Sequence, residues 1–325
     1  MLPAKAHTDA FATIERVREQ TSLTYFEFGT LAALQLMQQQ SLDIAILEVG
    51  LGGRLDAVNV VDADVAVVTS IGVDHVQFLG DNREQIGAEK VAIARPEKPL
   101  ICGDLQAPKS IRAYAEKIAA KLYQSGRQFS YSSTNSHWHY HGINATLMQL
   151  PQPQLPLVNA ATSLAALECL PLAVSADAIK AGLVKASLPG RLQQTQYQSC
   201  DVLLDVGHNP HAAAYLASVI RTRFKHRPIV AVVGMLADKD HEGVFAALAD
   251  VVDRWYLGSL TEPRGNSSAE LAQAVSLQGN AIAGKFDSVE AAFRQAINDG
   301  QVEKPLVFVF GSFYTVGRIN QLIRS

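Results

Sequence analysis

Residues 48–56, with the sequence EVGLGGRLD, have the side-chain types that metal and phosphate chemistry needs. The apolar run at residues 44–47 precedes them, so we expect a buried strand that ends on Glu48 and a glycine-rich turn that carries Arg54 and Asp56. Open α/β sheets bind ligands at the carboxyl ends of their strands. A carboxylate there suits a hard cation, with Mg²⁺ and phosphate as the expected pair. The alternative is a tight turn with a surface salt bridge.

Two more polar residues follow the next apolar run, at residues 64–71. His75 comes just after its end, where parallel strands would bring it to the same sheet edge as Glu48; a hydrogen-bonded loop histidine is the alternative. Lys90 lies on a helix expected at residues 83–94. If it points at the strand ends, desolvation favours a neutral amine that can react with carbon dioxide to give an anionic ligand. A surface Glu–Lys pair is the alternative.

The second half of the sequence has three polar loops that follow expected strands. The first contains Asp205, His208 and Asn209, at the place where a doubly wound sheet binds its ligand. Asn209 also fits a helix N-cap, and both roles are compatible because a helix start attracts anions. The other two loops cover residues 234–240 and 311–315.

Alternating strands and helices must position these loops. Strands are expected at residues 202–206, 229–233, 255–260 and 306–310, separated by helices. This order indicates a parallel, doubly wound α/β sheet. We place a domain boundary at the break after Pro189, which gives domains 1–189 and 190–325.

The first half is less regular. Residues 22–28 favour an extended segment, and a helix with Thr30 as N-cap is expected at residues 30–39. Residues 128–149 favour antiparallel hairpins. His137, His139 and His141 alternate in this region and would share one face of a strand. A metal triad is conceivable, but a solvated face of the hairpin is the favoured interpretation.

Composition narrows the class of protein. The chain has 325 residues, of which 48% are hydrophobic and 18% charged, so we expect about two globular domains. A net charge of −3 gives no electrostatic footprint for nucleic acid, and no apolar run is long enough to span a membrane. Widely spaced Cys102, Cys169 and Cys200 exclude a CxxC zinc site and give no disulfide framework, so we expect a cytoplasmic protein.

Eight runs, in this order, resemble the folylpolyglutamate synthase/dihydrofolate synthase family of the Mur ligase superfamily in its bifunctional bacterial form. They are residues 24–30, 47–56, 69–75, 89–90, 189–191, 205–211, 234–240 and 311–313. The resemblance covers essentially the whole sequence. It implies a Mur-ligase-type central ATPase and pterin-binding domain, truncated at its N-terminus, followed by a Rossmann-like glutamate ligase domain.

The resemblance also implies an activity. The family joins dihydropteroate or a folate to L-glutamate through an acyl phosphate, with ATP as co-substrate and Mg²⁺ as cofactor. A monomer that binds neither nucleic acid nor membrane is expected.

Roles for individual residues follow from the same resemblance. The matching Mg²⁺ ligands are Glu48 and His75, and the matching carbamylated lysine is Lys90. The pterin-contacting positions match Thr24, Tyr25, Phe26, Glu27, Leu55, Asp56 and Ala57. Asn159 matches the asparagine that binds the adenine of ATP in the family, and Arg191 and Asp205 match residues that contact ATP across the interdomain cleft. His208 lies where the family places the glutamate and acyl-phosphate chemistry.

One motif is absent from the sequence. No G-x-x-x-x-G-K-[ST] occurs in it, and the resemblance places Met1 inside the first domain. We therefore expect the family's phosphate-binding loop and its Mg²⁺-binding serine to be missing from this chain. Two other functions stay open: a chain that binds folate or glutamate without turning over ATP, and a ligase of the superfamily that acts on muramyl precursors.

Overall fold

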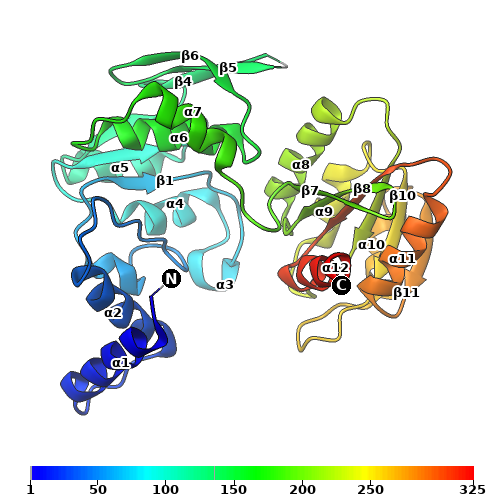
Figure 1. The fold of residues 1–325 in the computed structure, drawn as a ribbon, viewed down its shortest axis with the longest axis horizontal. Helices are drawn as coiled ribbons and strands as arrows, with labels where there is room; N and C mark the ends of the chain where they lie inside the picture. The colour runs from blue at the N-terminus through cyan, green and yellow to red at the C-terminus, as the bar shows by residue number, and fades with distance from the viewer. Residues whose placement is uncertain (1, 135) are drawn as a thin grey trace.

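The computed structural model describes residues 2–134 and 136–325. Its ribbon forms an N-terminal unit, from α1 to α7, and a C-terminal unit, from β7 to α12, with one crossing of the chain between them (Figure 1). The observed α/β architecture agrees with the expected fold class, whereas the domain limits of 1–189 and 190–325 stay a prediction.

The N-terminal unit is built around a small parallel sheet. Its strands run in the order β1 (Ala66–Val68), β2 (Pro99–Cys102) and β3 (Lys121–Gln124). A separate antiparallel sheet consists of β4 (Ser130–Ser133), β5 (His137–His141) and β6 (Thr146–Pro151). The helices are α1 (Ala4–Arg18), α2 (Tyr25–Gln38), α3 (Val76–Leu79), α4 (Arg83–Val91), α5 (Lys109–Lys117), α6 (Leu157–Glu168) and α7 (Ala176–Lys185), with the 3₁₀ helix η1 (Ala57–Val60).

Side chains of β2 pack on both faces of the parallel sheet. Leu100 and Cys102 join a core cluster with Ile86 of α4. Ile101 faces the other way and packs with Trp138 of the antiparallel sheet and with helix α6. Both faces of the strand are therefore buried, as a continuous apolar run predicts.

The strand expected at residues 44–48 is not formed. Within the described residues this segment joins no sheet, and Ile44 and Ile46 are 42% and 86% exposed. An apolar run becomes a strand only where a neighbouring strand pairs with its backbone, and none does so here. The prediction that Glu48 ends a buried strand was therefore wrong, although Glu48 still precedes the glycine-rich turn.

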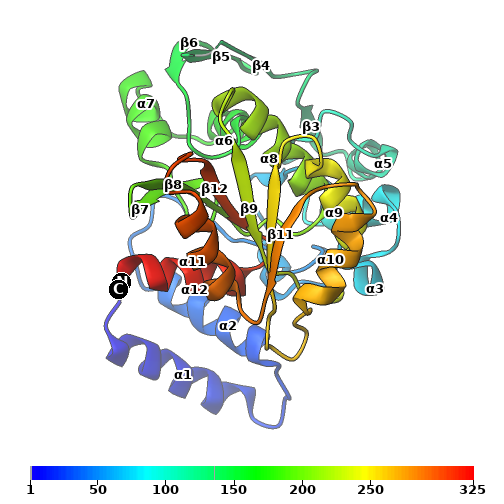
Figure 2. The same cartoon turned by 90° about the vertical axis from the view of Figure 1, so that its right-hand side faces the viewer.

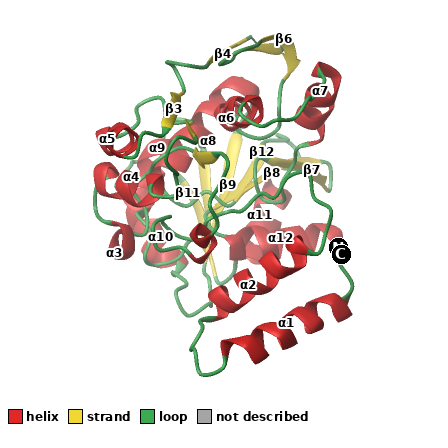
Figure 3. Ribbon diagram, turned by 90° about the vertical axis from the view of Figure 1, so that its left-hand side faces the viewer, coloured by secondary structure: helices red, strands yellow, loops and turns green. Residues whose placement is uncertain are grey.

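Helix α2 begins earlier than expected. Its N-cap is Thr24, not Thr30, and the Thr24 backbone N–H donates to Glu27 Oε2 at 2.7 Å while the Glu27 N–H donates to Thr24 Oγ1 at 3.2 Å. This reciprocal capping box satisfies two backbone donors at the helix start. Helices α1 and α2 lie side by side and project from the rest of the unit (Figures 1 and 3).

The C-terminal unit has a six-stranded sheet between two helical layers (Figure 2). The strand order is β11 (Ile282–Phe286), β10 (Arg254–Gly258), β9 (Ile229–Val233), β12 (Leu306–Phe310), β8 (Cys200–Asp205) and β7 (Gln193–Tyr197), with only β7 antiparallel. One layer contains α8 (Pro210–Arg223), α9 (His241–Leu248) and α10 (Ser268–Ser276), and the other contains α11 (Val289–Asp299) and α12 (Phe313–Arg324).

The three predicted polar loops follow β8, β9 and β12, which are neighbours in this sheet. Parallel pairing brings the carboxyl ends of these strands to one edge of the sheet, so the expectation that polar loops follow parallel strands of one sheet is confirmed. Within the described residues, no helix is long and apolar enough to cross a membrane.

Candidate active site

The glycine-rich turn is closed by the carboxylate of Asp56. Its Oδ2 accepts the backbone N–H groups of Gly50 and Leu51 at 2.9 and 3.0 Å, and its Oδ1 accepts that of Val58 at 3.0 Å. The same contact makes Asp56 the N-cap of η1. The Asp56 side chain thus fixes the shape of the turn. From the sequence we expected it only as a contact to the pterin.

The turn docks on the last turn of α4. The Arg54 N–H donates to the Glu89 carbonyl at 2.9 Å, and Arg54 Nε donates to the Glu89 carboxylate at 3.0 Å. A Cβ on Gly53 would lie 2.7 Å from the Glu89 carbonyl oxygen, so only glycine allows this approach. Lys90 follows Glu89 and is half-buried, and this burial lowers its pKa while the charge of Asp74 opposes the shift.

The two segments expected to contact the pterin lie against each other. The Phe26 ring sits beside Gly50, where a Cβ would come within 3.1 Å of Phe26 Cζ. Tyr25, at the start of α2, and Leu55, in the turn, are 97% and 80% exposed. Ala57 begins η1 directly after Asp56. Exposed apolar and aromatic side chains beside a fixed turn are available to stack on a flat ligand.

The loop before His75 is held by an ion pair between the buried Asp104 and the partly exposed Arg83. Asp104 Oδ2 accepts the Ile71 N–H at 2.8 Å and Arg83 Nη2 at 2.7 Å, while Arg83 Nε donates to the Ile71 carbonyl at 2.9 Å. His75 itself has the left-handed conformation, with φ of 52°. Such a conformation is uncommon for a non-glycine residue and collects at functional sites.

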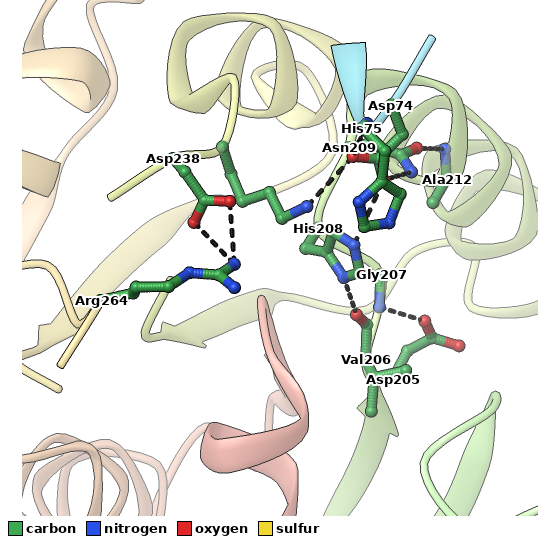
Figure 4. Close-up of polar contacts among 11 residues, drawn as sticks. Asp74, His75, Asp205, Val206, Gly207, His208, Asn209, Ala212, Asp238 and Arg264 are labelled. Carbon is green, nitrogen blue, oxygen red and sulfur yellow. Dashed lines mark hydrogen bonds and ion pairs between the residues drawn. The ribbon is translucent and has the colours of Figure 1, made fainter. Parts of the chain in front are cut away.

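Four polar side chains meet where the two units touch (Figure 4). Asp74 Oδ1 accepts Lys239 Nζ at 3.0 Å, and Asp74 Oδ2 accepts Asn209 Nδ2 at 3.2 Å and lies 3.4 Å from His208 Nε2. The hydrogen bonds from His208, and then those from Lys239 and Asn209, hold the pKa of Asp74 well below its usual range, although burial acts in the opposite direction.

His208 and Asn209 each have a second contact that fixes them. His208 Nδ1 lies 2.9 Å from the Val206 carbonyl, and Asn209 Oδ1 accepts the Ala212 N–H at 2.9 Å. Asn209 is therefore the N-cap of α8, as predicted, with Pro210 as the first helical residue.

A pocket of about 230 Å³ opens beside this junction. It is lined by Arg191, Asp205 and His208 together with the first turn of α8. Asp205 accepts the N–H groups of Leu192 and Gly207 at 2.8 and 2.7 Å, and its burial raises its pKa. The Arg191 guanidinium lies 5.2 Å from the centre of the Phe313 ring.

Comparison with known proteins decides the family. The Mur ligase middle domain matches residues 2–164, and the Mur ligase glutamate ligase domain matches residues 190–313. The dihydrofolate synthase/folylpolyglutamate synthase of Escherichia coli K12 is 48% identical over 322 residues, which cover 99% of this chain and 75% of that protein. The chain belongs to the dihydrofolate synthase/folylpolyglutamate synthase family of Mur ligases. It therefore falls in the folate branch and not among ligases of muramyl precursors.

Solved structures of this family agree with the fold. E. coli FolC in complex with DHPP and ADP superposes with a TM-score of 0.93 at 47% identity, over 99% of this chain and 76% of that one. The bifunctional enzyme of Yersinia pestis, complexed with AMPPNP and Mn ion, superposes with a TM-score of 0.92 at 45% identity, over 100% of this chain and 77% of that one. The chain thus spans about three quarters of the length of its relatives.

The residues expected to hold the family's metal ion lie on two separate loops. Glu48 is exposed, and His75 stands in the turn before α3. Within residues 2–134 and 136–325, no group of three or more His, Cys, Asp or Glu side chains is arranged to hold a metal. The same holds for His137, His139 and His141 of β5: among the described residues they are not arranged to hold a metal ion. The Glu48 carboxylate is a donor that Mg²⁺ prefers, and the neutral imidazole of His75 is a common metal ligand, so each has a suitable donor atom for an ion whose other ligands are phosphate oxygens and water.

Asn159 is placed differently from the other expected ATP contacts. It lies in the first turn of α6 with an exposed side chain and does not line the pocket, although Pro156 of the same segment does. The sequence interpretation also missed Asp74 and Lys239. Their signal was available, because Asp74 directly precedes His75 and Lys239 lies in one of the three polar loops, but only the structure brings them together.

Proposed function

We propose that this protein ligates L-glutamate to dihydropteroate or a folate in an ATP-dependent reaction. The main support is the junction itself: the loops that follow β8 and β9 in the glutamate ligase domain meet the His75 loop of the middle domain, beside the pocket. Family membership at 48% identity supplies the substrate class.

The proposed chemistry needs two transfers in one place. A carboxylate oxygen of the pterin substrate attacks the γ-phosphorus of ATP and ADP leaves, which gives an acyl phosphate. The glutamate amine then attacks the acyl carbon, inorganic phosphate leaves, and the nitrogen loses a proton. The protein's task is to place the reactants and to balance their charge.

We assign the chain's residues to these tasks. Tyr25, Phe26 and Leu55 would contact the pterin ring, and Arg191 would face the nucleotide from the pocket. A Mg²⁺ ion held by Glu48 and His75 would neutralise phosphate charge. The closure of two units around the reactants excludes water from the acyl phosphate.

The test is a ligation assay with the 325-residue chain. Dihydropteroate, L-glutamate and Mg·ATP should give dihydrofolate, ADP and phosphate in equal amounts. Glu48→Gln and His75→Ala should each lower kcat/KM by about a hundredfold or more, as the loss of transition-state charge stabilisation does elsewhere. Glu116→Gln is the matched control because Glu116 is exposed on α5, away from the junction. Turnover near the wild-type value in both site variants would refute the metal assignment.

A second candidate function is the binding of folate or glutamate without turnover. The 325 residues contain no G-x-x-x-x-G-K-[ST] motif, so the binding of Mg·ATP by these residues is the property to measure. Titration with Mg·ATP separates the two candidates. Micromolar binding of Mg·ATP supports the ligase, whereas folate binding by a folded chain that does not bind Mg·ATP supports the second candidate.

We also propose that the protein works in the cytoplasm. Cys102, Cys169 and Cys200 are all free in the structure, and a reducing compartment keeps thiols in that state.

A further inference from the structure

Contacts between the two units converge on one carboxylate. Asp74 belongs to the N-terminal unit, and it binds Lys239, Asn209 and His208, which all belong to the C-terminal unit. Its Oδ1 also accepts the backbone N–H of His75 at 2.8 Å. One side chain thus links the expected metal-binding loop to two loops of the glutamate ligase domain (Figure 4).

Lys239 depends on this contact. Its side chain is only 9% exposed, and among the described residues its ammonium group has a hydrogen bond to Asp74 alone. A buried ammonium group without a counter-charge is strongly disfavoured. If the two units separated, Lys239 would have to move into water, so the position of Lys239 and the closure of the units are coupled.

The loop that carries Asp74 is anchored by hydrogen bonds within the N-terminal unit. Two residues of the N-terminal unit, Arg83 and Asp104, hold both polar groups of the Ile71 backbone, three residues before Asp74. A Cβ on the neighbouring Gly72 would lie 3.2 Å from Cβ of His211 in α8, so the loop also packs closely against the C-terminal unit. The carboxylate therefore occupies a defined place relative to both units.

We propose that Asp74 is a positioning residue that latches the two units and holds Lys239, His208 and Asn209 at the junction. The contacts that make up the latch are all between residues of this chain. The expected effect of the latch on L-glutamate binding rests on the proposed function, whereas its expected effect on the closure of the two units does not.

The experiment measures the distance between the units by fluorescence energy transfer. Dyes are attached to cysteines introduced as Lys117→Cys in α5 and Arg294→Cys in α11, both exposed positions, with Cys169→Ser to remove the most accessible native thiol. The starting chain should give one narrow distance distribution. Asp74→Asn keeps the shape but removes the charge, and it should lower the ratio of closed to open molecules roughly tenfold or more.

Two further variants separate positioning from general damage. Lys239→Met should open the units less than Asp74→Asn does, because His208 and Asn209 still contact Asp74. The double variant should open them no further than Asp74→Asn, because both changes remove one shared interaction. Asp74→Glu should restore part of the closed population. Asp238→Asn is the matched control, since it breaks the 2.8 Å ion pair with Arg264 that lies within the C-terminal unit.

The ligation assay adds a kinetic measurement. Asp74→Asn should raise KM for L-glutamate more than KM for Mg·ATP. An unchanged distance distribution in Asp74→Asn, or additive opening in the double variant, would overturn the latch. A chain that closes as described but does not ligate glutamate would instead contradict the proposed function and leave the latch supported.

Discussion

Substitution of Gly53 by alanine tests whether the glycine-rich turn must touch helix α4. A Cβ at this position would lie 2.7 Å from the Glu89 carbonyl oxygen, 3.0 Å from the Lys90 carbonyl oxygen and 3.1 Å from Ile93 Cγ2. The two carbonyl groups belong to the helix backbone and cannot turn away as a side chain would. The turn must therefore move outward, which weakens the 2.9 Å hydrogen bond from the Arg54 N–H to the Glu89 carbonyl.

The size of the effect follows from three contributions. Overpacking costs about 1–3 kcal/mol, and the weakened hydrogen bond costs about 0.5–1.5 kcal/mol. Alanine restricts the unfolded chain and returns about 0.4–1 kcal/mol. The free energy of unfolding should thus fall by roughly 0.5–4 kcal/mol, which corresponds to a decrease in Tm of about 1–16 °C for a unit of this size.

Thermal unfolding followed by circular dichroism measures this decrease, and Gly29→Ala provides the control. Gly29 lies inside α2 with no heavy atom within 4 Å of a built Cβ, so alanine there should raise stability by about 0.5–1 kcal/mol. Opposite signs for the two substitutions are expected. If Gly53→Ala is as stable as Gly29→Ala, the close approach of the turn to α4 is not a constraint, and the reasoning fails.

Three other predictions concern the same unit. Arg83→Met leaves the buried carboxylate of Asp104 without its half-exposed cation, so we expect a loss of about 1–3 kcal/mol of stability and weaker Mn²⁺ binding. Unchanged unfolding and Mn²⁺ titration curves would contradict the clamp on the His75 loop. Because burial lowers the pKa of Lys90, the folded chain releases that proton before the unfolded chain does. Stability should therefore rise as pH increases from the folded pKa towards the ordinary value of 10.5, and Lys90→Met should abolish this rise in urea titrations across that range. A neutral Lys90 amine should also take up ¹³C-labelled carbon dioxide and give a carbamate NMR signal, which Lys90→Arg should lack.

Elements buried on both sides could be predicted from the sequence. The strands β8, β9 and β12 are continuous apolar runs, and turn signals separate them from the helices that follow. The edge strands were missed: β7 reads QQTQY and β11 reads IAGKF, both only partly buried. An edge strand packs less of its surface, so its sequence carries a weaker hydrophobic signal.

The candidate site divides in a similar way. Asn209 as N-cap, the three polar loops after parallel strands of one sheet and the family followed from local patterns and motif order. The capping box of Thr24 and Glu27 was also visible locally, yet the apolar and aromatic residues around it favoured a strand instead. The strand at residues 44–48 was wrong because pairing depends on a partner that an apolar run cannot specify.

The sequence by itself therefore determined the family, the fold class and which loops carry polar residues, because residue types, motif order and turn signals are local properties of the chain. Only the tertiary structure decided which of them act together. Asp74 and Lys239 are 165 positions apart, and nothing in their local sequences couples them. Their contact exists because the buried clamp on Ile71 and the order of strands β9, β12 and β8 bring two loops to one junction, where desolvation makes the pairing of opposite charges necessary.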